Sequence, residues 1–120
     1  MSKAAISLCT GLEDPEKVTV AFLVAVGAAE SGCETMLFLT KEAVRLAIPG
    51  VARAVACEGC PPLAHLVERY AAAGGQVIAC GICVDAKGLD ANAFATNVRK
   101  AGSVQLWEWI GDDAAVTFSF

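Results

Sequence analysis

A short apolar run followed by two cysteines lies within residues 74–89, which read GGQVIACGICVDAKGL. The two glycines follow a helical pattern, and glycine is favoured just after the last turn of a helix. Residues 76–80 form an apolar run of strand length, which predicts a buried strand. Residues 81–89 are typical of a loop. The sequence therefore predicts a strand that ends at Cys80 and opens into a loop there.

Strand-like runs alternate with helical patterns along the rest of the chain. This alternation predicts a layered α/β fold, and the length of 120 residues fits a single domain over residues 1–120. The other predicted strands cover residues 4–9, 35–39 and 114–120. The predicted helices cover residues 15–30, a brief segment after Thr40, 63–73, 90–101 and 103–109, whereas residues 51–60 fit no single element.

The clearest helix begins after Asp14, whose side chain predicts an N-cap, with Pro15 in the first helical position. Its apolar residues recur at helical spacing and are expected to face the sheet; they are Val18, Phe22, Ala25 and Ala29. The helix over residues 63–73 has a similar face, made of Leu63, Leu66, Val67 and Tyr70. The only histidine, His65, falls off that face, so we expect it to point to solvent.

The composition excludes several classes of function. Hydrophobic residues make up 56% of the chain and charged residues 18%, which is enough apolar surface for a folded core. The formal net charge of −4 disfavours a protein that binds nucleic acid or a membrane surface. The longest apolar run, residues 18–29, is shorter than the roughly 20 residues that cross a bilayer. We therefore expect a cytoplasmic protein without a signal peptide, whose cysteines are mostly reduced.

Four of the six cysteines form two pairs of the type Cys-x-x-Cys. The pairs are Cys57 with Cys60 and Cys80 with Cys83, and 19 residues separate them. This spacing is common in structural zinc sites, where two short knuckles deliver four thiolates to the metal. However, the segment between the pairs is predicted to be a helix and a buried strand, which is unlike a zinc ribbon. Zinc held by these four cysteines is therefore the alternative hypothesis, and the preferred one involves no cofactor.

Cys80 fits a different chemistry, that of a thiol which carries sulfur as a persulfide. Such a thiol should be held rigidly at the end of a strand and face a loop that partner molecules reach, and open α/β sheets place their ligand sites there. A thioredoxin-like redox role fits less well, because the residues after Cys80 do not predict the long helix that activates such a thiol. Asp85 would oppose a thiolate at this place, and Lys87 would favour it.

The segment around Cys80 resembles the hallmark of the DsrE/DsrF-like family. Members show a helix that ends in glycines, a short strand, a cysteine at the end of this strand and a glycine eight residues later. Cys80 and Gly88 match those two positions. The similarity extends over nearly the whole chain, including residues 36–47 and Trp109 with the terminal run. Cys60, which precedes a predicted helix, resembles the cysteine of a subgroup with that arrangement.

The resemblance implies a flavodoxin-like α/β layer fold with a mainly parallel sheet flanked by helices. It also implies a homo-oligomer, either a trimer or a hexamer, and a role in sulfur relay with a donor or acceptor protein as partner. In that family the cysteine matched by Cys80 accepts sulfane sulfur and passes it to a partner thiol. We therefore expect Cys80 to be the catalytic thiol and Cys83 its assistant, in a sulfur carrier or a sulfurtransferase-like protein.

The remaining candidates have plainer interpretations. Cys9 and Cys33 lie in or beside predicted strands and are expected in the core. The aromatic residues near the C-terminus are expected in the core or at a subunit interface; they are Trp107, Trp109, Phe118 and Phe120. A further hypothesis is an oligomeric scaffold with inert thiols, in which Cys80 is simply a buried apolar residue.

Overall fold

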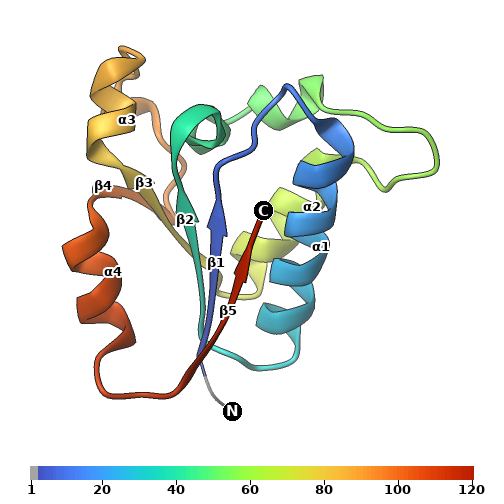
Figure 1. Cartoon of the computed structure of the whole chain (residues 1–120). Coiled ribbons are helices and arrows are strands. Elements are labelled where there is room, and N and C mark those ends of the chain that lie inside the picture. The colour runs from blue at the N-terminus through green and yellow to red at the C-terminus, as the bar shows by residue number, and fades with distance from the viewer. Residues whose placement is uncertain (1–2) are drawn as a thin grey trace.

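Five strands form one sheet in the computed structural model of the chain, which describes residues 3–120 (Figure 1). The order of the strands is β4-β3-β2-β1-β5, and every neighbouring pair is parallel. The predicted α/β fold with a parallel sheet is therefore confirmed. The strands are β1 (Lys3–Leu8), β2 (Thr35–Leu39), β3 (Gln76–Cys80), β4 (Val98–Ala101) and β5 (Ala115–Ser119).

Helices α1 (Pro15–Glu30) and α2 (Leu63–Ala72) cover one face of the sheet (Figure 1). Asp14 caps α1 as predicted, because its carboxylate accepts a hydrogen bond from the backbone N–H of Lys17 at 3.1 Å. The predicted apolar face of α1 is buried along its whole length. Neither these two helices nor any other helix in the described part of the chain has the length and hydrophobicity to cross a membrane.

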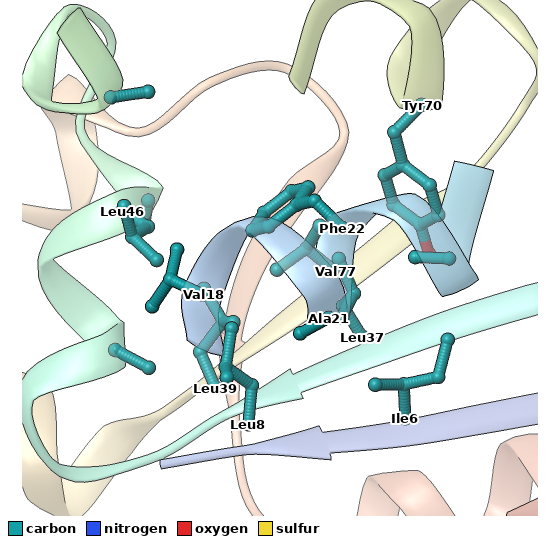
Figure 2. Packing of buried hydrophobic residues seen from close by; sticks show 14 of the residues in the cluster. Ile6, Leu8, Val18, Ala21, Phe22, Leu37, Leu39, Leu46, Tyr70 and Val77 are labelled. Atoms are coloured by element: carbon teal, nitrogen blue, oxygen red, sulfur yellow. The ribbon is translucent and has the colours of Figure 1, made fainter. Parts of the chain in front are cut away.

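The core lies between these helices and the sheet (Figure 2). Tyr70 of α2 is buried in it, and its hydroxyl donates a hydrogen bond of 2.7 Å to the carbonyl of Gln76. Burial raises the pKa of the Tyr70 phenol above its ordinary value. A Cβ atom added at Gly75 would lie 2.4 Å from the Tyr70 ring, so only glycine fits between α2 and β3. The strand residues of the core include Ile6, Leu8, Leu37, Leu39, Val77 and Ala79.

Short helical segments follow the carboxyl ends of β2 and β3. The chain after β2 forms the 3₁₀ helices η1 (Lys41–Ala47) and η2 (Val51–Ala54). The chain after β3 forms α3 (Gly81–Ala86), so the prediction of a loop directly after Cys80 is wrong. The helix is brief because Gly88, at φ 64°, adopts the left-handed conformation that ends helices. This helix begins with a glycine and is too short to show helical periodicity in the sequence, so it could not be predicted from the pattern.

The predicted helix over residues 90–101 is also wrong. Asp90 caps only one turn, η3 (Ala91–Ala93), by accepting a hydrogen bond of 2.9 Å from the N–H of Asn92. The chain then enters β4, which is an edge strand of the sheet and pairs with β3. Arg99 and Lys100 in its centre are exposed, and charged residues are common on edge strands because they discourage pairing with another chain. These charges removed the alternation that identifies a strand.

Helix α4 (Ser103–Ile110) lies on the opposite side of the sheet from α1 and α2 (Figure 1). Its first turn is closed by Gln105, whose side chain accepts a hydrogen bond of 2.8 Å from the Gly102 N–H. Every residue of α4 is described, and none of them is buried. Val104 and Trp107 are 62% and 70% exposed, so Trp107 does not belong to the core of this chain.

Candidate functional site

Cys80 is the last residue of β3 and directly precedes α3, so it lies at the carboxyl edge of the parallel sheet. Its backbone pairs with Ala101 of β4, which fixes its place in the sheet. The thiol is free and half-buried, and the side chain packs against the core. The predicted strand end at Cys80 is confirmed, and this edge is where open α/β sheets bind their ligands.

An open cleft of about 730 Å³ lies beside Cys80. The ends of β2, β3 and β4, helix α3 and the beginning of α4 form its walls, and most of the lining is apolar. Ile82, at the start of α3, is 83% exposed at the cleft. The cleft gives small molecules and partner side chains a path to the thiol. Its lining consists of Phe38, Thr40, Cys80, Gly81, Ile82, Asp85, Ala101, Gly102, Ser103, Val104 and Gln105.

Cys83 contacts the segment that follows β2. It lies on α3 and is half-buried, and its Sγ accepts a hydrogen bond of 3.2 Å from the backbone N–H of Lys41. Lys41 has a φ of 52°, which places a residue other than glycine in the left-handed region. Backbone strain of this kind is found preferentially at functional sites. The Lys41 N–H thus fixes the Cys83 sulfur between α3 and η1.

Two groups of ion pairs surround α3. The Lys87 ammonium lies 2.9 Å from Glu42, which also accepts a hydrogen bond of 2.7 Å from Arg45. The hydrogen bonds from Lys87 and Arg45 lower the pKa of the Glu42 carboxyl. On the other side of α3, the Lys100 ammonium lies 2.6 Å from Asp85. Lys87 and Asp85, which the sequence suggested as neighbours of a thiolate, are therefore engaged with partners of their own.

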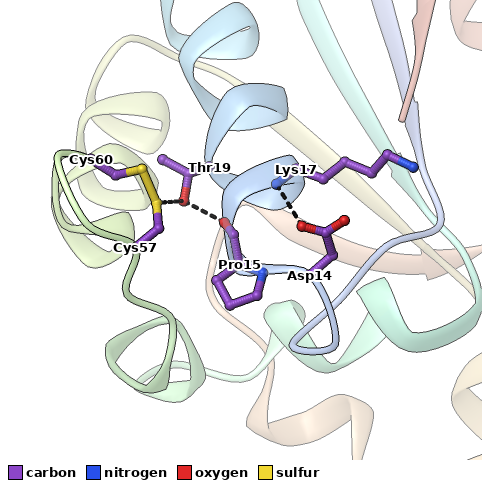
Figure 3. The surroundings of a disulfide bond; sticks show 6 residues. All are labelled: Asp14, Pro15, Lys17, Thr19, Cys57 and Cys60. Carbon is purple, nitrogen blue, oxygen red and sulfur yellow. Dashed lines mark hydrogen bonds between the residues drawn. A yellow bond between two sulfur atoms is a disulfide. The ribbon is translucent and has the colours of Figure 1, made fainter.

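Cys57 and Cys60 form a disulfide in the turn between η2 and α2 (Figure 3). Cys57 Sγ lies 3.7 Å from the Thr19 hydroxyl on α1, and that hydroxyl donates a hydrogen bond of 2.7 Å to the Pro15 carbonyl. A hollow of about 300 Å³ borders both cysteines and shares no lining residue with the cleft at Cys80. The two pairs of cysteines therefore occupy separate places in the molecule.

The four cysteines of the zinc hypothesis are not brought together. Residues 3–120 contain no group of three or more histidine, cysteine, aspartate or glutamate side chains placed to hold a metal ion. Cys57 and Cys60 are bonded to each other beside α1, whereas Cys80 and Cys83 lie at the start of α3. The sequence spacing suited a metal, but the helix and strand between the pairs hold them apart.

The other candidates from the sequence are less involved in the site. Cys9 is exposed, and its thiol donates a hydrogen bond of 3.4 Å to the carbonyl of Phe120, so its predicted place in the core is wrong. Cys9 follows the last residue of β1, where the chain leaves the sheet. Cys33 is half-buried. His65 is exposed on α2, as predicted.

Sequence reasoning missed three residues that shape the site. The sequence predicts only the start of a helix at Thr40 and Lys41. These residues follow β2, which is the neighbour of β3 in the sheet, and this places them near the end of β3. Lys100 lies on β4, which was not predicted, and its aliphatic carbons would lie 3.6 Å from a Cβ added at Gly81. The order of the strands could have identified these residues, because parallel strands bring their carboxyl ends to the same edge of the sheet.

Comparisons with known proteins give a consistent result. A sequence model of the DsrE/DsrF-like family matches residues 2–118. The crystal structure of the YchN protein from E. coli is similar over 100% of both chains, with a TM-score of 0.79 and 20% sequence identity. A protein of unknown function from Methanobacterium thermoautotrophicum is similar over 96% of this chain and 99% of its own, with a TM-score of 0.63 and 12% identity. Comparison with curated proteins gives no significant match.

Proposed function

The chain belongs to the DsrE/DsrF-like family, which is associated with sulfur relay, and from this premise we propose that it is a sulfur carrier. Cys80 accepts sulfane sulfur as a persulfide, and a partner thiol takes the sulfur from it. The observation that supports this most directly is the free thiol of Cys80 at the carboxyl end of β3, beside an open cleft. The protein is then sulfurtransferase-like, and its reaction needs no cofactor.

Loading exchanges one sulfur–sulfur bond for another. The Cys80 thiolate attacks the outer sulfur of a donor persulfide, R–S–SH, and forms Cys80–S–SH. The donor leaves as the thiolate R–S⁻, which takes a proton from water. The transferred sulfur keeps its oxidation state, so the step needs no oxidant or reductant. Thiolates are the nucleophiles in exchange reactions of this type.

Unloading reverses this exchange with a different thiol. An acceptor thiolate attacks the outer sulfur of Cys80–S–SH, takes it as its own persulfide and restores the Cys80 thiolate. Cys83 offers a second route, in which its thiolate attacks Cys80 Sγ, forms a disulfide with it and releases HS⁻. An external dithiol then reduces this disulfide. In the structure the Cys83 sulfur accepts a hydrogen bond from the Lys41 N–H, so this route requires the sulfur to leave that contact and turn toward Cys80.

The cationic side chains around α3 suit anionic sulfur species. The side chains of Arg45, Lys87 and Lys100 lie there with those of Glu42 and Asp85, so cations outnumber anions in this group, although the whole chain carries a formal net charge of −4. Persulfides and polysulfides are largely anionic at neutral pH, so an excess of positive charge raises their local concentration near Cys80. The same charges suit an acidic surface on a donor or acceptor protein.

We further propose that the protein works as a homo-oligomer, either a trimer or a hexamer. Exposed apolar side chains lie on both sides of the sheet, and contiguous exposed apolar surface commonly marks an interface between proteins. Ile82, Val104 and Trp107 are exposed around the cleft and α4, and Val116 and Phe118 are exposed on the edge strand β5. Native mass spectrometry measures the number of subunits, and a monomer at micromolar concentration would contradict this proposal.

Intact mass spectrometry tests the assignment of Cys80. Protein purified without oxygen is incubated with polysulfide and measured after denaturation. We expect a gain of one sulfur atom that reductant removes, and no gain in Cys80→Ser. Cys9→Ser is the matched control, because Cys9 is also a free thiol and lies outside the cleft. It should load like the parent protein.

The other outcomes point to the alternative functions. If Cys80→Ser gains sulfur as the parent protein does, Cys80 is not the carrier. If no variant gains sulfur, the thiols are inert and an oligomeric scaffold is the better description. A metal-sized mass that appears only in the native spectrum would favour the zinc-binding alternative.

A further inference from the structure

We propose that Cys57 and Cys60 form a second site, which exchanges electrons with dithiols through its disulfide and works independently of Cys80. This proposal goes beyond sulfur relay and does not rest on it. The substrate class is a dithiol reductant in one direction and a disulfide in the other. Three features carry the proposal: the small size of the ring that the disulfide closes, the exposure of that ring, and the hydroxyl that lies against one of its sulfurs.

The disulfide closes too small a ring to contribute much to the stability of the fold. Its cysteines are three positions apart, and a disulfide stabilises a fold chiefly by restricting the unfolded chain, an effect that grows with the length of the loop. The ends of the turn are already anchored, because Val55 before it and Leu63 after it are 4% and 1% exposed. The bond can therefore open while both ends of the turn stay in the core.

The turn offers the disulfide to other molecules. Glu58 and Gly59, between the two cysteines, are exposed, and both cysteines are only partly buried. The hollow of about 300 Å³ beside them is lined mainly by apolar groups, including Pro61 and Pro62. The hollow gives a small dithiol access to the two sulfurs. Exposed disulfides are the ones that exchange readily with thiols.

The Thr19 hydroxyl distinguishes the two sulfurs (Figure 3). It lies 3.7 Å from Cys57 Sγ and donates its hydrogen to the Pro15 carbonyl while the disulfide is intact. When Cys57 is released as a thiolate, a rotation of the hydroxyl lets it donate to the sulfur instead. A hydrogen bond to the charged form stabilises that form. The geometry therefore favours Cys57 as the leaving group and Cys60 as the sulfur that is attacked.

A dithiol reductant supplies the two electrons that open the disulfide. One thiolate of the reductant attacks Cys60 Sγ, which breaks the Cys57–Cys60 bond and forms a mixed disulfide. Cys57 leaves with the electron pair and takes a proton from water. The second thiolate of the reductant then attacks the reductant sulfur of the mixed disulfide and releases Cys60, which also takes up a proton. The pair gains two electrons and two protons, and the reductant becomes a cyclic or intramolecular disulfide.

Alkylation of the folded full-length protein tests the proposal. The protein is equilibrated with mixtures of reduced and oxidised dithiothreitol, quenched with iodoacetamide and digested with trypsin. We expect the peptide of residues 54–69, which contains both cysteines, to carry either no label or two labels, with a reversible transition between them. Cys80→Ser should show the same transition, because the two sites share no lining residue. Circular dichroism should show that the reduced protein stays folded.

Variants of Thr19 test the role of the hydroxyl. Thr19→Val should slow reduction by dithiothreitol at least about tenfold, because it removes the hydroxyl that would donate a hydrogen bond to the charged Cys57 sulfur. Thr19→Ser keeps the hydroxyl and should retain most of the rate. If Thr19→Val is reduced as fast as the parent protein, the hydroxyl does not assist the leaving sulfur, and the assigned direction of attack is wrong.

Two results would contradict the proposal that Cys57 and Cys60 form a second site. In the first, the peptide of residues 54–69 becomes labelled only after denaturation, which would make the disulfide structural. In the second, the folded protein is labelled at Cys57 and Cys60 without any reductant, which would mean that the disulfide does not persist. Failure of sulfur loading at Cys80 leaves the exchange at Cys57 and Cys60 untouched, so the two proposals fail separately.

Discussion

The two Cys-x-x-Cys pairs have the same spacing and lie in different surroundings. Cys80 and Cys83 join the end of a buried strand to a short helix, and their thiols are free. Cys57 and Cys60 lie in an exposed turn beside α1 and are bonded to each other. The residue before Cys80 is fully buried, whereas the residue before Cys57 is exposed.

The spacing within the two pairs is the same, so it cannot explain why one pair is bonded and the other is free. The element on which each pair lies explains this difference. In the turn, a left-handed glycine, Gly59 at φ 76°, folds the chain back so that the two sulfurs meet. At the end of β3, Cys80 is held by the sheet, and Cys83 is directed toward η1 by the Lys41 N–H. The pair in the turn is bonded to itself, whereas at the end of β3 only Cys80 faces the cleft that outside molecules reach.

The largest contrast between the pairs should appear in their reactivity. In the folded protein without reductant, iodoacetamide should label Cys80 but not Cys57 or Cys60, with a difference of about a hundredfold or more, because only a free thiolate is a nucleophile. Peptide mass mapping after brief exposure measures the extent of labelling at each residue. Equal labelling of the two pairs would remove the distinction between them.

The second contrast concerns stability at the glycines near each pair. Gly75→Ala should destabilise the protein by about 1–3 kcal/mol, since the new methyl group would overlap the buried Tyr70 ring. Gly59→Ala meets no neighbouring atom and should cost only about 1 kcal/mol, through its positive φ. Urea denaturation measures both. If Gly59→Ala is the more damaging change, the turn is more important for the fold than we infer.

The smallest contrast concerns the ion pairs beside each region. Glu42 bridges Lys87 and Arg45 near the Cys80 site, and Glu30 pairs with Arg69 between α1 and α2. These hydrogen bonds lower the pKa of both carboxyls from the ordinary value of 4.5. The stabilisation is therefore present above pH 4.5 and is lost as the pH falls through the lowered pKa values.

Glutamine variants measure these two contributions. Glu42→Gln and Glu30→Gln should each lower the Tm slightly at pH 7, with the larger effect at Glu42, which has two cationic partners. The Tm differences from the parent protein should shrink as the pH falls below 4.5 and through the lowered pKa values, because the carboxylates of the parent protein then become protonated as well. Differences that do not change over this fall in pH would mean that the side chains contribute through packing and not through charge.

Most of the fold was predictable because its strongest signals are local. The cap at Asp14, the apolar face of α1 and the glycines before β3 each specify an element within a few residues. The strand β4 and the helix α3 were missed because their formation depends on neighbours. β4 exists because β3 offers a free edge, and α3 forms where the chain turns away from the sheet.

The site was predictable only in part for the same reason. The place of Cys80 at a strand end was predicted, because the end of a strand is a local property of the sequence. The contact between Cys83 and Lys41 joins residues 42 positions apart, and the disulfide partner of Cys57 competed in the sequence with a four-cysteine metal site. Only the packing of the turn against α1 separates those two possibilities.

Transfer of sulfur through the protein tests the central claim, that Cys80 carries sulfur and the pair in the turn does not. Protein loaded with labelled sulfane sulfur is freed of donor and mixed with an acceptor thiol, and the label on the acceptor is followed in a single turnover. We predict that Cys80→Ser transfers nothing and that the double variant Cys57→Ser, Cys60→Ser transfers as the parent protein does. Normal transfer by Cys80→Ser, or its loss in the double variant, would contradict the account.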